Sequence, residues 1–322
     1  MSLAFHCANG IHAIVVHVNI ALLDPYYVDS HRLWAEGLMA NSRHTITIHH
    51  LTAAHWKWRM HGGVITLFHK MLSAPQSPDL VVCTDMADIA LLRAEMALHQ
   101  LHIPVVMYFH ENQLTYPWSS ADTDRSAARD RHYAWLNFSS ALVSDAVWFN
   151  SDFHKGNFLD ALPDFLEPFP DHRPSGAVEA IAKKSLVRYP GLMPATAIEK
   201  TPNEVPVILW NHRWEYDKNP EEFFHCLFRL AERQIPFQLV VAGRKFDRSP
   251  AIFEEARAKL GDRILHFGWI ESRTDYNLWL KRANVLPVTA RQEFFGYSVM
   301  EAVQHDVYPL LPKRLTYPEL IN

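Results

Sequence analysis

The sequence lacks the features that mark membrane-spanning chains, disulfide-rich secreted domains and disordered proteins. No uninterrupted apolar run approaches the roughly 18 residues that span a bilayer, because the most apolar stretch, residues 11–23, is broken by His12 and His17. The three cysteines lie far apart without paired spacing, which gives no support to a disulfide framework or a zinc knuckle. The N-terminal segment has neither the basic leader nor the compact apolar stretch of a secretory signal. We therefore expect a cytoplasmic protein that does not bind a membrane.

Charge of one sign is not in excess either. The chain holds 31 Lys and Arg against 35 Asp and Glu, a formal net charge of −4, so any polyanion that it binds must be met by a local patch. Its 322 residues are 48% hydrophobic, which excludes disorder as the dominant state and fits about two domains of roughly 150 residues each.

Acidic residues are absent between Glu36 and Asp79. The ionisable residues in this interval are all basic, namely Arg43, His44, His49, His50, His55, Lys57, Arg59, His61, His69 and Lys70. It is the strongest basic feature of the chain and therefore the first candidate for contact with a polyanion.

Short apolar runs rich in β-branched residues alternate with longer segments of helical period. This alternation is typical of parallel strands joined by crossover helices. The predicted strands are residues 18–23, 45–51, 80–84, 104–108, 146–150, 207–210, 238–242, 264–267, 285–288 and 308–311. The predicted helices are residues 30–41, 89–99, 131–143, 152–162, 220–233, 250–260, 272–282 and 295–304.

Prolines are concentrated where the helical and strand periods fade, between residues 162 and 206. We therefore predict a proline-rich connection at 166–205 between a first domain, 1–165, and a second domain, 206–322. The fold class is α/β, with two Rossmann-like doubly wound domains facing a cleft. In such domains ligands bind at the carboxyl ends of the strands.

Two carboxylates, Glu293 and Glu301, lie eight residues apart across a predicted junction between strand and helix. If the helix begins near Phe295, Glu293 stands at its start and Glu301 about two turns inside. The amides of Phe295, Gly296 and Tyr297 would then be donors at the positive end of a helix, suited to a phosphate, and Gly296 has no side chain to block close approach. The alternative is an ordinary helix with an acidic first turn.

Arg213 and Lys218 follow the first strand predicted in the second domain, at the same edge of the sheet as Glu293. Two cations there can neutralise a diphosphate leaving group, the arginine through its planar fork and the lysine as a point charge. The alternative is a solvated loop in which Arg213 pairs with Glu215 or Asp217.

His110 follows the strand predicted at 104–108 in the first domain. A neutral imidazole at this edge can donate to or accept from a sugar hydroxyl, and this location distinguishes His110 among 20 histidines. The pair His110 and Glu111 does not begin a zincin motif, because position 114 is leucine rather than histidine.

Together these elements resemble the retaining nucleotide-sugar glycosyltransferases of the GT-B fold, in which an E-x7-E element, an Arg and a Lys five residues apart, and a cleft-edge histidine recur. Longer strings narrow the resemblance to the tRNA-queuosine α-mannosyltransferases: YFHENQL at 108–114, DHRP at 171–174, HRWEYDK at 212–218 and EFFG at 293–296. The resemblance runs from about Asn19 to the last residue.

The resemblance implies transfer of mannose from the nucleotide sugar GDP-mannose to the queuosine base of a tRNA anticodon, with retention at the anomeric carbon. It assigns Arg213 and Lys218 to the diphosphate and Glu301 to the ribose. Glu293 at the sugar hydroxyls and His110 at the sugar are the expected catalytic residues. The other expected donor-binding residues are Phe295 and Gly296. Neither a metal nor another cofactor is expected, since cationic side chains and a helix end replace Mg²⁺.

The acid-free interval then has a candidate role in binding tRNA. Lys57 and Arg59 alternate with Trp56 and Trp58, a combination suited to neutralising phosphates and stacking on the unpaired bases of an anticodon loop. The alternative is that Trp56 and Trp58 share one face of a strand or loop and pack inward while the cations are solvated.

Two departures from the family pattern keep other functions open. Val28 and Asp29 stand where the family usually has paired glycines, and the second domain is expected to be short at its C-terminus, soon after the strand at 308–311. One alternative is a GT-B enzyme with another nucleotide sugar and a small-molecule or lipid-linked acceptor. Another is an RNA-binding protein with a decayed catalytic site. The oligomeric state is left open.

Overall fold

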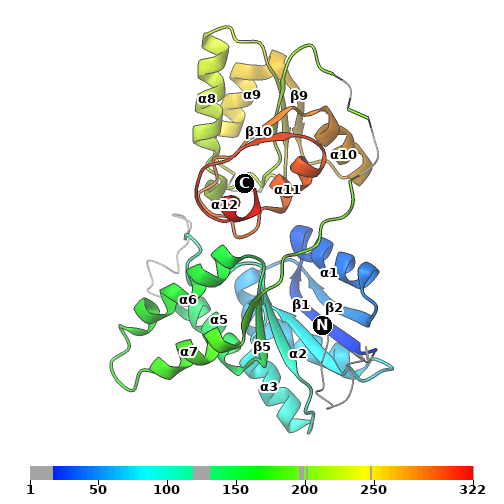
Figure 1. The fold of residues 1–322 in the computed structure, drawn as a ribbon, viewed down its shortest axis with the longest axis vertical. Helices are drawn as coiled ribbons and strands as arrows, with labels where there is room; N and C mark the ends of the chain where they lie inside the picture. Colours follow the sequence, from blue (N-terminus) through cyan, green and yellow to red (C-terminus); the bar gives the residue numbers. More distant parts are fainter. Residues whose placement is uncertain (1–16, 119–130, 196–198, 201, 247–248, 322) are drawn as a thin grey trace, which may run out of the picture. The chain divides into compact units, whose positions relative to one another are not determined.

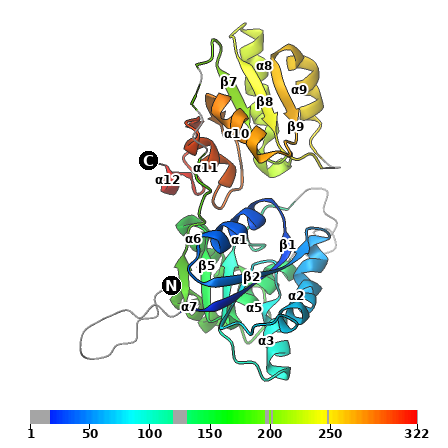
Figure 2. The ribbon, with the colours of Figure 1, turned by 90° about the vertical axis from the view of Figure 1, so that its right-hand side faces the viewer.

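The computed structural model describes residues 17–118, 131–195, 199–200, 202–246 and 249–321. The chain divides into two compact units (Figures 1 and 2). The described residues of unit 1 lie within 1–114, 130–149 and 158–191, and those of unit 2 within 115–129, 150–157 and 192–322. Two short stretches of the first half of the sequence thus belong to unit 2.

Unit 1 is built on a parallel six-stranded sheet of order β2-β1-β3-β4-β5-β6. Its strands are β1 (Asn19–Tyr27), β2 (Thr45–Thr52), β3 (Leu80–Thr84), β4 (Val105–Phe109), β5 (Ala146–Phe149) and β6 (Ser185–Val187). Its helices are α1 (Asp29–Asn41), α2 (Trp56–Leu72), α3 (Ile89–Leu98), α5 (Arg131–Val143), α6 (Asp152–Leu166) and α7 (Ser175–Lys183). The first residues of α6, 152–157, belong to unit 2.

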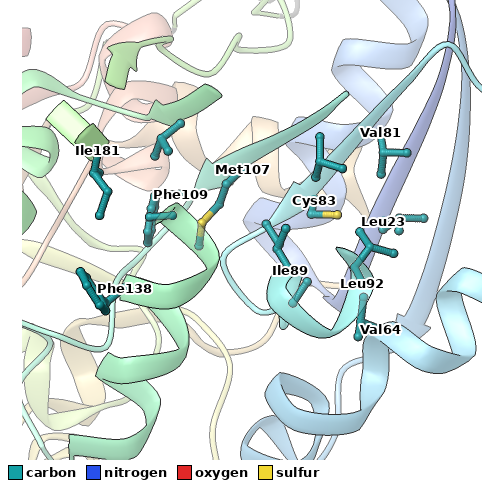
Figure 3. Packing of buried hydrophobic residues seen from close by; sticks show 14 of the residues in the cluster. Leu23, Val64, Val81, Cys83, Ile89, Leu92, Met107, Phe109, Phe138 and Ile181 are labelled. Carbon is teal, nitrogen blue, oxygen red and sulfur yellow. The ribbon is translucent and has the colours of Figure 1, made fainter. Parts of the chain in front are cut away.

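Helices cover both faces of this sheet, which explains why its central strands are apolar throughout. On one face, Cys83 and Met107 pack with Ile89 and Leu92 of α3 in a continuous core (Figure 3). On the other face, Trp34 of α1 stacks on Tyr108 at 4.2 Å between ring centroids. All the strands point the same way, so their carboxyl ends gather the residues that follow β1, β3 and β4 at one edge.

Unit 2 is built on a parallel five-stranded sheet of order β11-β10-β7-β8-β9. Its strands are β7 (Val207–Trp210), β8 (Gln238–Ala242), β9 (Ile264–Gly268), β10 (Val285–Pro287) and β11 (Tyr308–Leu310). Its helices are α8 (Pro220–Glu232), α9 (Ile252–Leu260), α10 (Arg273–Arg282), α11 (Tyr297–Gln304) and α12 (Tyr317–Leu320), with short 3₁₀ turns η1 (Tyr216–Lys218) and η2 (Gly261–Arg263).

An aromatic core supports one face of the second sheet. Trp214 stacks on Phe253 of α9 with ring centroids 4.2 Å apart, and Phe223 of α8 meets the edge of Trp210. Gly243, just after β8, has a φ of +149°, and a Cβ there would lie 2.0 Å from the backbone oxygen of His212. This close approach fixes the loop that follows β7, where the predicted donor residues lie.

The predicted α/β class is confirmed, and each strand predicted from the sequence is present with bounds shifted by a few residues at most. The helix α2 is the main omission, since only a strand or loop was considered around Trp56 and Trp58. Gly62 and Gly63 weaken its helical propensity. A Cβ at Gly63 would lie 2.8 Å from Pro25 Cβ, so glycine allows α2 to lie close to β1.

The predicted connection at 166–205 differs from the observed structure. Residues 175–183 form α7 and residues 185–187 form β6, the last strand of the first sheet. The boundary between the units falls after Gly191. The prolines at 168, 170 and 174 precede α7 rather than interrupting it, and so they stop one helix and start the next.

Candidate donor and sugar site

Lys218 is buried between two carboxylates in unit 2. Its Nζ lies 3.1 Å from Glu293 Oε2 and 3.2 Å from Asp217 Oδ2, and it donates to the backbone oxygen of Gln292 at 3.0 Å. Burial alone would lower the pKa of Lys218, but Asp217 and Glu293 outweigh it and raise that pKa above its ordinary value. In turn, burial opposes the ionised form of Glu293, and Lys218 more than offsets it, so the pKa of Glu293 is lowered. The site therefore holds a fixed cation beside a fixed carboxylate.

The backbone explains why Lys218 points into this site. The hydroxyl of Thr289, after β10, donates to the backbone oxygens of Lys218 at 3.0 Å and Asn219 at 2.9 Å. The amide of Arg291 donates to the backbone oxygen of Asp217 at 2.8 Å. The loops that follow β7 and β10 are thus joined, which brings Lys218 to Glu293 as expected from the sequence.

Arg213 occupies a more open position than Lys218. Its side chain is 41% exposed and pairs with Glu215 at 3.1 Å, as the alternative for this loop foresaw. It also donates to the hydroxyl of Tyr116 at 3.4 Å, and that hydroxyl donates to Asp217 Oδ2 at 3.1 Å. Arg213 is thereby connected to the group around Lys218, so the two predicted cations belong to one network.

The helix beside Glu293 begins later than predicted. It starts at Tyr297, with Gly296 as the preceding cap residue at a φ of +86°, a backbone conformation that glycine adopts without strain. Phe295 lies before the helix with its side chain buried, so its amide is not in the first turn, and its contact with the donor stays a prediction. The amides of Ser298 and Val299 lie in the first turn, where backbone N–H groups have no acceptor within the helix. The positive helix end itself remains next to Glu293.

Glu301 lies about one turn inside α11, not two, because the helix begins at Tyr297. Its carboxylate is bound by Arg273 at 2.7 Å and accepts from the hydroxyl of Tyr276 at 3.4 Å. Asn211, after β7, donates to the same hydroxyl. The structure thus places Glu301 in a polar network with its oxygens oriented, and its role toward a ribose stays a prediction.

His212, which was not singled out from the sequence, is buried between the predicted cations and α11. Its Nδ1 lies 3.0 Å from the hydroxyl of Ser298 in the first turn of that helix. Burial, with Lys218 and Arg213 nearby, lowers the pKa of His212 to about 4. A neutral imidazole therefore ties the loop to the helix start. Its position directly before Arg213 in the string HRWEYDK could have marked His212 as a site residue.

In unit 1, His110 follows β4 at the carboxyl edge of the sheet, as predicted. Its amide donates to Asp85 Oδ1 at 2.7 Å. Its ring stacks on His31 of α1 with centroids 3.9 Å apart, and His31 Nδ1 lies 3.1 Å from Asp24 Oδ2. Asp24, His31 and Asp85 were not predicted from the sequence, because only the strand order β1-β3-β4 brings them together.

Val28 and Asp29, which stand where the resemblance led us to expect paired glycines, form the entry to α1. Asp29 has a φ of 44°, in the left-handed region that glycine occupies more easily. The backbone therefore keeps a glycine-like turn although the glycines are absent.

The predicted RNA-binding residues start the helix α2. Trp58 is 64% exposed, which contradicts the alternative in which both tryptophans pack inward. Trp56 packs on Tyr133 of α5 at 4.9 Å, and Lys57 Nζ lies 5.5 Å from the Trp56 ring. Arg59 donates to the backbone oxygen of Thr52 at 3.4 Å. The structure thus brings the four residues together on one helical turn, and their contact with RNA stays a prediction.

Comparison with known proteins identifies the family. Residues 19–192 match the family model for the N-terminal domain of tRNA-queuosine alpha-mannosyltransferases, and residues 195–322 match the group 1 glycosyl transferases. A tRNA-queuosine alpha-mannosyltransferase of Drosophila melanogaster is 30% identical over 317 residues, which cover 94% of this chain and 81% of the relative.

Solved structures with low sequence identity share the fold. Sucrose-phosphate synthase of Thermosynechococcus elongatus matches with a TM-score of 0.62 at 13% identity, covering 90% of this chain and 80% of that one. The Anabaena protein HepE in complex with UDP-glucose matches with a TM-score of 0.62 at 15% identity, covering 95% and 83%. The fold is therefore GT-B, as predicted.

No helix within the described ranges is long and apolar enough to cross a membrane. The second sheet carries the glycosyltransferase domain, and the chain is accordingly a glycosyltransferase. With both family models matched in order and the relative aligned along nearly the whole chain, this protein belongs to the tRNA-queuosine alpha-mannosyltransferase family.

Proposed function

We propose that this protein transfers mannose from GDP-mannose to the queuosine base of a tRNA, with retention at the anomeric carbon. The observation that carries the proposal is the buried contact between Lys218 and Glu293 beside the start of α11. It offers a fixed cation for a diphosphate and a carboxylate for a sugar in adjacent positions. The family match supports the acceptor, and the family relative's name supports the sugar.

The donor's diphosphate would bind Lys218 and Arg213, with the first amides of α11 as further donors. Because Arg213 is the more exposed cation, it can exchange its contact with Glu215 for a phosphate oxygen. The glycosidic C–O bond to GDP then breaks, an acceptor hydroxyl oxygen bonds to the anomeric carbon on the same face, and its proton passes to the departing phosphate. The cations stabilise the charge that develops on GDP.

Glu293 would bind the sugar hydroxyls. Its side chain is 18% exposed, so one oxygen can reach a ligand while the other keeps its contact with Lys218. His110 is assigned to the sugar as a neutral imidazole. We propose that no metal takes part, because the cations and the helix end already supply positive charge at the diphosphate.

The first turn of α2 is proposed to contact the tRNA. Trp58 presents an exposed ring for stacking, while Lys57 and Arg59 can neutralise phosphates. Since tRNA is the acceptor, we place the reaction in the cytoplasm.

The test incubates the purified protein with labelled GDP-mannose and with tRNA that carries or lacks queuosine. Label should enter only the queuosine-containing tRNA, and UDP-sugars should not replace GDP-mannose. Transfer to a small-molecule or lipid-linked acceptor instead would contradict the proposed acceptor. Absence of transfer to either tRNA would also contradict the proposal.

A further inference from the structure

A group of titratable side chains gathers at the carboxyl ends of β1, β3 and β4 in unit 1, and the proposed chemistry uses one of them. Asp24 lies in the buried part of β1 near its carboxyl end, Asp85 directly follows β3, and His110 and Glu111 follow β4. His31 reaches the group from α1. Asp24 and Asp85 are fully buried and His31 is 7% exposed. Burying two carboxylates is costly unless they have fixed partners, so such a group calls for a function.

Asp24 holds His31 in one orientation. His31 Nδ1 lies 3.1 Å from Asp24 Oδ2. The other oxygen of Asp24 accepts from the amide of Tyr26 at 2.9 Å and from the hydroxyl of Thr84 at 3.3 Å. Hydrogen bonds from β1 and β3 therefore fix the Asp24 carboxylate, and the carboxylate in turn fixes the His31 imidazole.

His31 in turn confines the ring of His110. The two rings stack at 3.9 Å with an angle of 25° between their planes. Trp34 and Tyr108 meet the same ring edge-on, each with centroids 4.9 Å apart, while the His110 amide is held by Asp85. Of these three rings, His31 alone lies nearly parallel to His110, and so it sets the plane of the His110 imidazole.

The charge on His31 acts in the same direction. Burial alone would lower the pKa of His31, but Asp24, Asp85 and Glu111 face it and together raise the pKa to about 9. His31 is then an imidazolium at neutral pH. The contact with Asp24 is therefore charged, and it holds the His31 ring, whose centroid lies 3.9 Å from that of His110, more firmly than a neutral hydrogen bond would.

We propose that His31, held by Asp24, is a positioning residue that fixes the plane of the His110 ring for its work at the sugar. This inference rests on the proposed function, because the role of His110 belongs to it. His31 itself need not touch the substrate.

The kinetic test compares His31→Phe, His110→Ala and the double variant with the wild-type protein. Phenylalanine keeps a ring against His110 but removes both the bond to Asp24 and the charge. We expect each single variant to lower kcat by about 10- to 100-fold and the double variant to be no slower than His110→Ala. GDP affinity should not change, because the diphosphate residues lie in unit 2. Additive losses, or a His31→Phe kcat within about twofold of wild type, would overturn the proposal.

His99→Phe is the matched control. His99 follows α3, at the opposite end of the crossover, and its ring contacts Phe68 at 5.1 Å. This variant makes the same change in side chain within unit 1, and kcat should remain at the wild-type value. Where His31→Phe fails to fold, Asp24→Asn takes its place, because it removes the charge that holds His31 and keeps the shape.

A second readout separates this inference from the proposed function. With ¹⁵N-labelled histidine rings, NMR should show His31 protonated at pH 7 and titrating near pH 9, and Asp24→Asn should shift the ring signals of His110 but not those of His99. If the wild-type protein transfers no mannose while these signals respond as described, the proposed function fails and the contact between the histidines stands. If transfer is normal and the His110 signals do not respond, the positioning role fails.

Discussion

At the scale of single residues, the proposed donor site depends on how the buried Lys218 is kept charged. Lys218 is 9% exposed at its side chain and has two carboxylates within 3.2 Å. Such a cluster is stable only while it is complete, since removing one member leaves the others buried without a partner. The contacts of Lys218 with Asp217 and Glu293 therefore also hold the loops after β7 and β10 together.

Replacing this lysine should cost both stability and binding. Lys218→Met leaves Asp217 and Glu293 buried without their cation, so we expect the free energy of unfolding to fall by about 3–5 kcal/mol. GDP binding should be abolished. The control is Lys259→Met, which breaks an exposed ion pair with Glu255 and should change stability by less than about 0.5 kcal/mol. Urea denaturation and calorimetry measure the two effects, and equal losses in both variants would contradict this account.

The buried pair of His31 and Asp24 makes stability depend on pH. The pKa of His31 is raised to about 9 in the folded protein, against 6.5 without its partners. Its contribution is therefore fully present below pH 6.5 and is lost as the pH rises through 9. Burial also raises the pKa of Asp85 to about 7, and this likewise lowers stability as the pH rises from about 4 to 7.

We accordingly expect the free energy of unfolding to fall by on the order of 2–3 kcal/mol between pH 6.5 and 9. Asp24→Asn should flatten this decrease, whereas Asp164→Asn, an exposed carboxylate on α6, should leave it unchanged. Denaturation curves at several pH values measure it. A wild-type curve that is flat above pH 6.5 would show that His31 does not hold its proton.

The site residues that belong to a sequence motif could be predicted, whereas those brought together only by the fold could not. Lys218 and Glu293 each belong to a sequence motif that follows a predicted strand, and the structure places the two side chains in contact. Asp24 and His31 carry no signal of their own, because their meaning depends on the strand order that sets β1 beside β3 and β3 beside β4. A buried histidine next to an aspartate cannot be told from a solvated one before that order is known.

At the scale of elements, the start of α11 depends on the backbone conformation of one glycine. Gly296 has a φ of +86°, and a Cβ there would lie 3.4 Å from Glu293 Cγ. The glycine both permits the turn and leaves Glu293 its place beside the helix end. The helix start was predicted two residues early, because the apolar pattern around Phe295 does not reveal a left-handed residue before the helix.

Substitutions of glycine separate this backbone requirement from ordinary helix propensity. Gly296→Ala should lower the free energy of unfolding by about 1–2 kcal/mol, since alanine is strained at a positive φ, and should weaken GDP binding. Gly37→Ala, inside α1 with open space around its Cβ, should instead stabilise the protein by about 0.5–1 kcal/mol. Thermal unfolding compares them, and a gain in stability from Gly296→Ala would refute the role of the turn.

The first turn of α2 is the element on which tRNA binding is proposed to depend. Replacing Lys57 and Arg59 by alanine should weaken tRNA affinity and reduce the slope of log K against log salt by roughly 0.7–0.9 for each phosphate that is no longer neutralised. Lys183→Ala on α7, an exposed lysine paired with Glu179, should leave the slope unchanged. Binding titrations at several salt concentrations measure these slopes. Identical slopes for the wild type and both variants would show that Lys57 and Arg59 are solvated and do not contact tRNA.

The helix α2 itself shows why some elements cannot be read from local sequence. Its two glycines and the β-branched residues after them favour other conformations. Its helical form depends on one apolar face that is buried in the core, including Val64, Leu67 and Phe68. Elements with a strong local pattern, such as β3 and α5, were predicted to their observed bounds.

At the scale of the whole molecule, the net charge of −4 does not reveal two separate groups of cationic side chains. One is the start of α2 in unit 1, and the other is the pair Arg213 and Lys218 in unit 2. A nucleic acid and a diphosphate each require local positive charge, and neither requires a basic chain. The near-neutral composition therefore does not exclude binding of nucleic acid. The presence of two Rossmann-like sheets in tandem was predicted from the alternation of strands and helices alone.

A competition in one tube tests whether this protein transfers mannose to queuosine alone. Equal amounts of queuosine-containing and queuosine-free tRNA are incubated with GDP-mannose and either the wild-type protein or Glu293→Gln, and the tRNA is digested to nucleosides for mass spectrometry. We predict one added hexose on queuosine alone, removable by an α-mannosidase, and a rate at least about 100-fold lower for Glu293→Gln. Hexose on other nucleosides, a product resistant to that enzyme, or equal rates for the two proteins would contradict the account.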